Sequence, residues 1–219
     1  MREPGRGGMA VLAPDVTRGL VRRLRLTHLL GRFDERIVWA AFMLVNGFLT
    51  IGLLGAVAAL SGTPFVFPSL GPTAFLFFFS PSSPSATPRH AILGHAIGIA
   101  CGYGSLVLFG LTQAGPATVV GVTPARVLAA ALSFAATGAL MVLLRAAHPP
   151  AGATTLLISL GALTQPAHLA IIEVAVAVLA LQAIAINRLA GLDYPLWARR
   201  RSADPAAGVR THPGGRQAT

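Results

Sequence analysis

The stretch "AAHPPAGATTLLISLG" (146–161) places a histidine and two prolines directly before a run of small residues in an otherwise apolar region. Proline is tolerated in the first turn of a helix, because its missing N–H would have no intrahelical partner there. The stretch therefore predicts a helix that begins at the His-Pro-Pro stretch and runs through Leu160. It does not predict an unbroken continuation of the apolar segment before it.

The composition of the chain places this interrupted helix in a membrane. Of 219 residues, 54% are hydrophobic and only 11% are charged, and the mean hydropathy is +0.68. Soluble domains carry about 25% charged residues. Four apolar runs reach or approach the roughly 20 residues that a spanning helix needs. We predict full spans at 37–60, 90–111, 126–144 and 167–187.

Two shorter apolar segments contain proline and glycine near their start. They are "FVFPSLGPTAFLFFF" (65–79) and the segment 148–163. Both fit the pattern P-x-x-G-x-T-x-x-L, from Pro68 in the first and from Pro149 in the second. Irregular backbone at membrane depth is tolerated only where protein or a water-filled cavity satisfies its polar groups. We therefore predict two discontinuous helices of related design.

A second match supports an internal repeat. Pro88 and Pro166 are each followed two positions later by histidine. Seven positions beyond these prolines stand His95 and Glu173, each inside a predicted span. Two matches in the same order favour duplication over coincidence.

The predicted fold is thus an all-α integral membrane protein with two three-segment repeats, about 37–111 and 126–190, each containing one broken helix. If the broken segments cross the membrane, there are six crossings and the second repeat is inverted. If they dip in and return, there are four full spans plus two re-entrant segments. We favour six crossings, because they place Arg89 and Arg145 inside and only Arg126 outside.

Both ends of the chain are basic, and the net charge is +10. Arginines concentrate before the first span (1–36) and after the last (191–219). The positive-inside rule predicts that both termini are cytoplasmic, in a bacterial cytoplasmic membrane. "VTRGLVRRLRLTHLL" (16–30) fits an amphipathic helix on an anionic surface or a disordered tail. We expect disorder in 191–219. No aromatic-interleaved basic motif points to nucleic acid.

The two predicted helix starts suggest an anion site. A helix start leaves backbone N–H groups free and carries the positive end of the helix dipole. Small residues would leave these donors uncovered, and hydroxyls would add to them. In an inverted repeat the two starts can face each other near the bilayer midplane. The predicted substrate-binding residues are His148, Pro149, Pro150, Gly152 and Thr154 in the second repeat, and Ser69, Gly71 and Thr73 in the first.

Ionisable groups inside a membrane need a partner or a use. His95 and Glu173 hold equivalent repeat positions, which predicts a pair across the pseudo-axis. That pair would serve either as a proton relay or as a structural link. Asn46 lies in the middle of the first span and would line a pathway or bond a neighbouring helix. Arg145 would attract anions or extend to the interface.

Glycine recurs every fourth residue in the second span, at Gly94, Gly98 and Gly102. Such a stripe lets another helix approach closely. We therefore expect this face to serve in packing.

Features of soluble enzymes are absent from the sequence. It contains no G-x-S-x-G, no H-E-x-x-H, no phosphate-binding loop and no nearby carboxylate pair. Cys101 is the single cysteine, so no Cys-x-x-Cys metal site exists. We expect no enzymatic activity, metal or cofactor. A membrane-embedded enzyme that uses His148 with Glu173 or His95 is one alternative, and a scaffold or sensor that does not transport is another.

Residues 148–161 and 69–90 resemble the HPP family of integral membrane proteins, named for the motif carried here by His148, Pro149 and Pro150. The resemblance covers about 35–190 and includes a similar "PSSP" turn at 81–84. Thr87 stands where the family pattern has glutamine. The resemblance implies four annotated spans and, for plastid and cyanobacterial members, nitrite transport. We therefore expect a transporter or channel for a small inorganic anion, nitrite first, in contact with the lipid bilayer and open to homo-oligomer formation.

Overall fold

A computed structural model describes residues 25–198, and this part of the chain contains helices and no strand. Four helices are long and apolar enough to cross a membrane, which confirms the four predicted spans. They are α3 (Glu35–Ser61), α5 (Pro88–Leu108), α7 (Pro124–Leu143) and α9 (Pro166–Leu189). Three of them begin with proline at the first helical position, where its missing N–H costs nothing.

Two short apolar helices correspond to the predicted broken segments. Helix α4 spans Leu70–Phe79 with 10 residues, and α8 spans Ala151–Ser159 with 9 residues. At 1.5 Å per residue each covers about 15 Å, or half of a hydrocarbon core about 30 Å thick. Each repeat is therefore long helix, short helix, long helix. The remaining elements are α2 (Leu26–Leu29), the 3-10 turn η1 (Pro84–Ala86) and α6 (Ala117–Val120).

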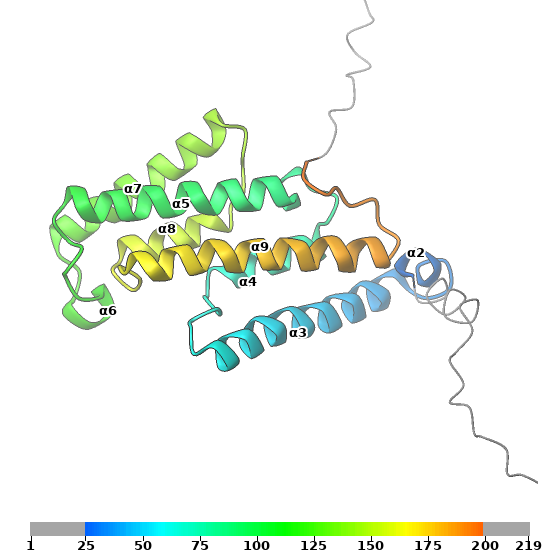
Figure 1. Cartoon of the computed structure of the whole chain (residues 1–219). Helices are drawn as coiled ribbons and strands as arrows, with labels where there is room; N and C mark the ends of the chain where they lie inside the picture. Colours follow the sequence, from blue (N-terminus) through cyan, green and yellow to red (C-terminus); the bar gives the residue numbers. More distant parts are fainter. Residues whose placement is uncertain (1–24, 199–219) are drawn as a thin grey trace, which may run out of the picture.

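The helices alternate in direction along the bundle. Helix α3 runs away from the end that carries α2, the α4 segment returns toward it, and α5 runs away again (Figure 1). The second repeat follows the opposite sequence of directions. Backbone hydrogen bonds tie the chain together at the α2 end, where Leu26 N donates to Ala190 O at 2.9 Å and Arg89 N donates to Trp197 O at 3.0 Å. The two predicted repeats thus have opposite orientations in the bundle.

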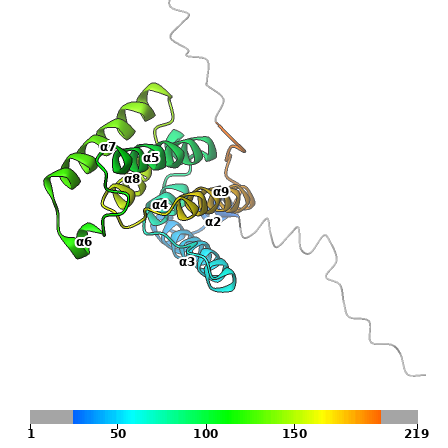
Figure 2. The ribbon, with the colours of Figure 1, turned by 60° about the vertical axis from the view of Figure 1, so that its left-hand side comes forward.

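Each short helix lies between a long helix of its own repeat and one of the other repeat. Helix α4 packs against α3 and α9, whereas α8 packs against α7 and α5 (Figure 2). The repeats therefore exchange packing partners, and neither short helix is buried by its own repeat alone.

The glycine stripe of α5 faces α8, as expected. A Cβ on Gly98 would lie 2.8 Å from the Thr155 hydroxyl and 2.9 Å from the Ala151 carbonyl oxygen. A Cβ on Gly94 would lie 2.6 Å from the Cβ of His148. Real Cβ atoms do not approach so closely, so only glycine permits this contact between α5 and α8.

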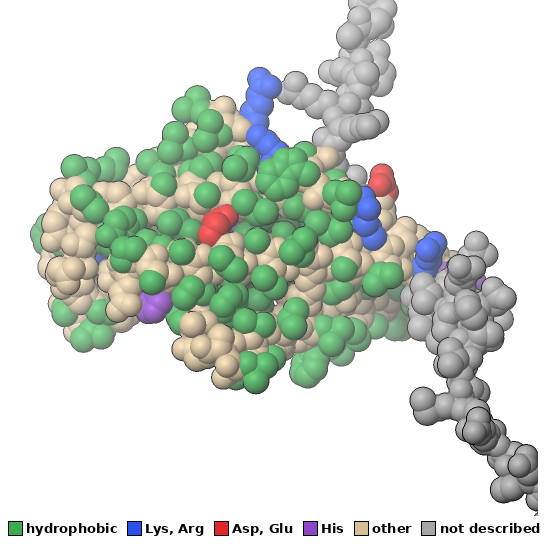
Figure 3. All heavy atoms as spheres, in the orientation of Figure 1, with side chains coloured by type: hydrophobic (Ala, Val, Ile, Leu, Met, Phe, Trp, Pro, Cys, Tyr) green, Lys and Arg blue, Asp and Glu red, His purple; other side chains and the backbone are tan. Residues whose placement is uncertain are grey.

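The outer surface of the bundle is apolar. Large side chains such as Leu44, Phe48 and Leu143 are exposed, and Figure 3 shows hydrophobic groups spread over the visible face. Exposed apolar area on this scale is normal for helices that contact lipid.

After α9 the structure describes residues 191–198 of the predicted tail. Tyr194 is 1% exposed, and its hydroxyl donates to the Ala86 carbonyl. The Tyr194 ring packs this segment against the bundle, which the basic composition of the tail did not indicate. Residues 199–219 lie outside the described part, as does most of the predicted surface helix at 16–30.

Candidate functional site

His148, the first residue of the His-Pro-Pro stretch, is fully buried beside the first turn of α8. Its Nδ1 lies 2.8 Å from the Ser85 carbonyl oxygen, and its Nε2 lies 3.1 Å from the Thr73 hydroxyl. Ser85 and Thr73 both belong to the first repeat. Both side-chain hydrogen bonds of His148, a residue of the second repeat, are therefore made with residues of the first repeat.

His95 connects the two broken segments. Its Nε2 lies 2.8 Å from the Thr73 hydroxyl and its Nδ1 lies 2.8 Å from the Thr154 hydroxyl. These threonines occupy the same position of the P-x-x-G-x-T-x-x-L pattern in the two repeats. The rings of His95 and His148 are 5.2 Å apart between centroids. The structure thus brings together His148, Thr73, Thr154 and His95 in one buried hydrogen-bonded cluster.

The predicted His95–Glu173 pair does not form. Both ring nitrogens of His95 are occupied by threonines, and the carboxylate oxygens of Glu173 are buried with no hydrogen-bond partner in the described part of the chain. Helix α9 buries the face that carries Leu169, Ile172 and Val176. Glu173 lies beside that face, so equivalent sequence positions do not become neighbours.

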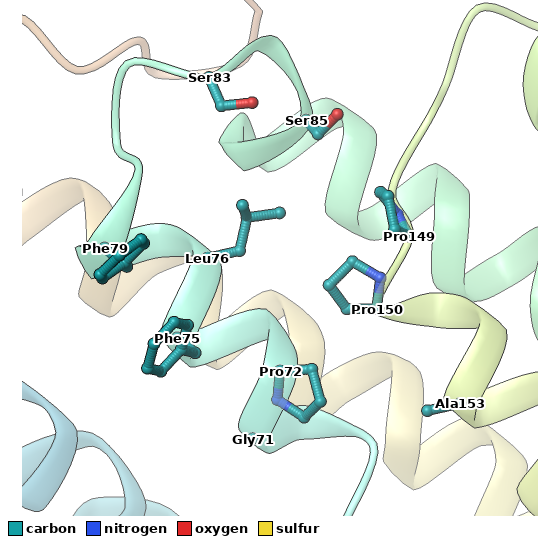
Figure 4. Close-up of a pocket in the computed structure, with 10 residues that line it drawn as sticks. All are labelled: Gly71, Pro72, Phe75, Leu76, Phe79, Ser83, Ser85, Pro149, Pro150 and Ala153. Atoms are coloured by element: carbon teal, nitrogen blue, oxygen red, sulfur yellow. The ribbon is translucent and has the colours of Figure 1, made fainter.

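A cavity of about 890 Å³ separates the two short helices. Figure 4 shows Pro72, Phe75 and Leu76 of α4 on one side and Pro149 and Pro150 on the other. Its lining is mainly carbon, with hydroxyls at Ser83 and Ser85 on the connection between α4 and α5.

The two equivalent glycines meet different surroundings. A Cβ on Gly71 would have no atom within 4 Å, so the first turn of α4 is uncovered beside the cavity. A Cβ on Gly152 would lie 3.0 Å from the ring of Phe134 on α7. Gly71 therefore fits the predicted role of an uncovered helix start, whereas Gly152 serves close packing.

The backbone donors that we expected to be free at the start of α8 are engaged. The N–H groups of Ala151, Gly152 and Ala153 donate to the carbonyls three residues earlier, at distances of 3.0 to 3.1 Å. The His-Pro-Pro stretch thus forms a tight turn that consumes these donors. At the start of α4, Leu70 N likewise donates to the Phe67 carbonyl at 2.9 Å. The difference is the side chain of Ser69, which is 1% exposed and whose hydroxyl has no partner in the described chain.

Arg145 and Asn46 lie away from this cluster. The Arg145 side chain is exposed, and its backbone, at φ 50°, presents a carbonyl that accepts from Arg89 Nη1 at 2.8 Å. Asn46 donates to the Phe42 carbonyl of its own helix at 2.7 Å. It borders a second cavity of about 670 Å³ between α2, α3 and α9. Neither residue is brought to the paired short helices.

Arg126, which the sequence analysis placed at the outer end of the span 126–144, is buried. It is 2% exposed and donates to the carbonyls of Ser159, at 3.2 Å, and Gly115, at 2.9 Å. A cation near the last turn of a helix is favoured by the helix dipole. Sequence alone did not indicate this role, because Arg126 stands at the start of a span, and an arginine at the membrane–water interface needs no partner in the protein.

Polar residues on α7 form a second network beside α8. Thr137 donates to the Ser133 carbonyl at 2.8 Å and lies 3.0 Å from the Thr155 hydroxyl. Ser133, Thr137 and Met141 recur every fourth residue and are all buried. That spacing is the sequence signal that could have identified the α8-facing side of α7. No group of three potential metal-ligating side chains occurs in residues 25–198.

Four apolar spans, two half-length helices and a lipid-facing apolar surface define a multi-pass, all-helical integral membrane protein. The chain matches the family described as "HPP, transmembrane region" over residues 34–195. It therefore belongs to the HPP family, which confirms the resemblance inferred from the motif.

A protein of Dictyostelium discoideum, named as a transmembrane protein, is 33% identical over 124 residues. The alignment covers 56% of this chain and 37% of that relative, so the chain spans little more than a third of the relative's length. No solved structure matches this chain.

Proposed function

We propose that this protein is a six-crossing transporter or channel for a small inorganic anion, with nitrite as the first candidate. The observation that carries the proposal is the meeting of two discontinuous helices across a cavity of about 890 Å³. Discontinuous helices that meet inside a repeat pair are the usual binding architecture of secondary transporters.

The start of α4 is the part of the site best suited to hold an anion. Gly71 leaves the first turn uncovered, and the neighbouring Ser69 hydroxyl is buried without a partner. The helix dipole and free donors favour negative charge at such a place. The proposed substrate contacts are therefore at Ser69 and Gly71, and the His-Pro-Pro turn forms the facing wall. The Thr73 hydroxyl, also predicted as a contact, is buried and engaged with His95 and His148.

Nitrite enters the proposal through the resemblance to family members associated with its transport. A small monovalent anion needs a few hydrogen-bond donors and no bulky pocket. We propose transport over catalysis because both ring nitrogens of His148 are engaged with Ser85 and Thr73. An embedded enzyme using this histidine would first have to release one of those partners.

The proposed topology has both termini in the cytoplasm. Arg89 and Arg145 then lie on the cytoplasmic side, joined by the hydrogen bond from Arg89 Nη1 to the Arg145 carbonyl. Arg126 lies at the opposite end, bonded to Gly115. This distribution follows the positive-inside rule.

A cysteine at Gln113 distinguishes six crossings from four. In a Cys101→Ala background, Gln113→Cys lies between the two repeats, outside the membrane for six crossings and inside for four. We expect labelling of intact cells by an impermeant thiol reagent. Labelling only after permeabilisation would overturn the six-crossing topology.

Reconstitution tests the transport proposal. Purified protein in liposomes is expected to carry nitrite down a gradient, and empty liposomes supply the baseline. Gly71→Ile should block flux by filling the uncovered start of α4. Gly104→Ile on α5 is the matched control, because Gly104 is exposed and a Cβ there also has no atom within 4 Å. Flux that is equal in both variants would place the pathway elsewhere, and no flux from the parent protein would remove the function.

A further inference from the structure

We infer that His95, Thr73 and His148 form one proton-accepting unit, in which a single excess proton passes between the two imidazoles through the Thr73 hydroxyl. This inference deepens the proposed transport and rests on it for the role of the proton. The hydrogen-bond chain itself stands on the geometry of the cluster.

The direction of every hydrogen bond in the chain follows from one backbone carbonyl. The Ser85 carbonyl can only accept, so His148 carries its hydrogen on Nδ1. Nε2 of the neutral ring then accepts from the Thr73 hydroxyl. Because Thr73 has spent its only hydrogen, its oxygen accepts from Nε2–H of His95.

The other end of the chain follows by the same reasoning. With its hydrogen on Nε2, neutral His95 uses Nδ1 as an acceptor for the Thr154 hydroxyl, 2.8 Å away. The two histidines are therefore held as opposite tautomers, Nδ1–H in His148 and Nε2–H in His95. A chain with one consistent direction is the arrangement through which a proton can be relayed.

An excess proton enters at Nδ1 of His95. Once that nitrogen is protonated, it donates to the Thr154 hydroxyl oxygen, which turns to accept. His95 then gives its Nε2 proton to the Thr73 oxygen while Thr73 passes its own proton to Nε2 of His148. His148 ends with the positive charge, His95 ends neutral as the Nδ1–H tautomer, and Thr73 is unchanged. Only N–H and O–H bonds are made or broken.

The charge stops at His148. The Ser85 carbonyl cannot take up the Nδ1 proton, so the proton leaves by the reverse route. A cation at this position sits beside Pro149, which lines the cavity. The unit therefore places a positive charge next to the proposed anion site when a proton is bound, and withdraws it when the proton leaves.

The unit holds one charge at a time, because two imidazolium rings 5.2 Å apart would repel strongly. The packing elements supply few other charges. Neither α4 nor α8 contains an ionisable side chain, and η1 contains none. The remaining ionisable groups on the long helices are Glu35 and Arg36 on α3, Arg89, His90, Cys101 and Tyr103 on α5, Arg126 on α7, and His168, Glu173 and Arg188 on α9.

Three of these groups have hydrogen-bond partners outside the unit, and of the three His90 is close enough to His148 for like charges on the two rings to repel. Arg89 and His90 contact the Arg145 carbonyl, at 2.8 Å and 3.0 Å. Arg126 contacts Ser159 and Gly115 at the other end of α8. No hydrogen bond or ion pair of the described chain ties these residues to the three-residue unit.

Nitrogen-15 NMR of the imidazoles, with the full chain in lipid, tests the unit directly. Histidine signals are assigned from single His→Gln variants. We expect Nδ1–H in His148 and Nε2–H in His95 at neutral pH, and one shared protonation step on acidification. Thr73→Val should confine the first proton to one of the two rings, because the hydroxyl that relays it is gone, whereas Thr73→Ser should keep the step shared between them. Thr137→Val is the matched control, because Thr137 is a buried threonine that takes no part in the hydrogen bonds of the His95–Thr73–His148 unit.

The opposite tautomer in either histidine of the parent protein would overturn the inference, as would a shared step that survives in Thr73→Val. Transport supplies a separate readout. If the parent carries nitrite, Thr73→Val should lower the accompanying proton uptake at least about tenfold, as expected for loss of a positioned proton carrier. Unchanged proton uptake in that variant would overturn the inference while the transport function stands. Absence of flux in the parent would overturn the proposed transport function. The NMR result alone would then test whether His95 and His148 share a proton.

Discussion

The two repeats share a sequence pattern but pack with different closeness. Around α8, helix α5 approaches so closely that a Cβ on Gly98 would lie 2.8 Å from the Thr155 hydroxyl and one on Gly102 would lie 3.0 Å from the Cβ of Ile158. Around α4, a cavity of about 890 Å³ remains on one side, and a second of about 670 Å³ lies between α3 and α9. The two predicted repeats therefore have the same order of helices but different spacing between them.

The residues on the two equivalent long helices explain this difference. Gly94, Gly98 and Gly102 of α5 correspond, 78 positions later, to Ile172, Val176 and Ala180 of α9. All six are buried. Glycine permits backbone contact, whereas isoleucine and valine hold a neighbouring helix away by the thickness of a side chain. The more loosely packed region, around α4, is thus the one that borders α9, where Ile172 and Val176 replace glycines.

Gly98→Val should produce the largest effect, because it breaks the tight half. The new side chain would meet the Ala151 backbone, which cannot move without shifting α8. We expect a loss of about 3 kcal/mol in the free energy of unfolding, at the upper end for overpacking. Thermal unfolding in detergent measures it. Gly104→Val, on the same helix with open space around it, should be nearly neutral, and equal losses in both variants would contradict the close contact.

Arg126→Leu should cause the next largest loss in the free energy of unfolding, because it removes the side chain that binds the C-terminal end of α8. Two carbonyls would lose a charged donor, for an expected loss of about 2 kcal/mol. The unfolding midpoint of Arg145→Leu serves as the control, since that side chain is exposed. A stability equal to that of the parent would show that water satisfies these carbonyls without the arginine.

Asn187→Leu tests the corresponding contact at the end of α4. The Asn187 amide donates to the Phe77 carbonyl at 3.1 Å, and Asn187 is fully buried. We expect a loss of about 1 kcal/mol, smaller than for Arg126 because the donor is neutral. Asn46→Leu is the comparison, because Asn46 bonds only a carbonyl of its own helix. If Asn46→Leu is the more damaging, the inter-helix bond of Asn187 contributes little.

Glu173→Gln should have the smallest effect on folding. Glu173 is the repeat equivalent of His95, but its carboxylate has no hydrogen-bond partner in the described chain. We expect a change within about 0.5 kcal/mol in unfolding experiments on the chain in detergent. A loss several times larger would reveal a partner, and its disappearance on dilution would identify that partner as a second copy.

The order of the elements could be predicted from the sequence. Long apolar runs require spanning helices whatever surrounds them, because unpaired backbone groups are too costly in lipid. The four spans, the two broken helices and the glycine stripe follow from that constraint and from the chemistry of proline and glycine. The residues of the cluster were also recognisable, since His95, His148, Thr73 and Thr154 are polar groups in apolar segments.

Only the tertiary structure decided which of these polar groups meet. The equivalent repeat positions of His95 and Glu173 predicted that the two would pair. Such a pair requires α9 to turn Glu173 toward His95, but the rotation of α9 about its axis turns Glu173 away. The free donors expected at the start of α8 depended on the conformation of the His-Pro-Pro turn, which instead bonds them locally. Sequence by itself determined the four spans and the positions of the two broken helices, because those follow from local backbone chemistry. The partners of each buried side chain follow from helix rotation and spacing, which arise only when all the helices pack together.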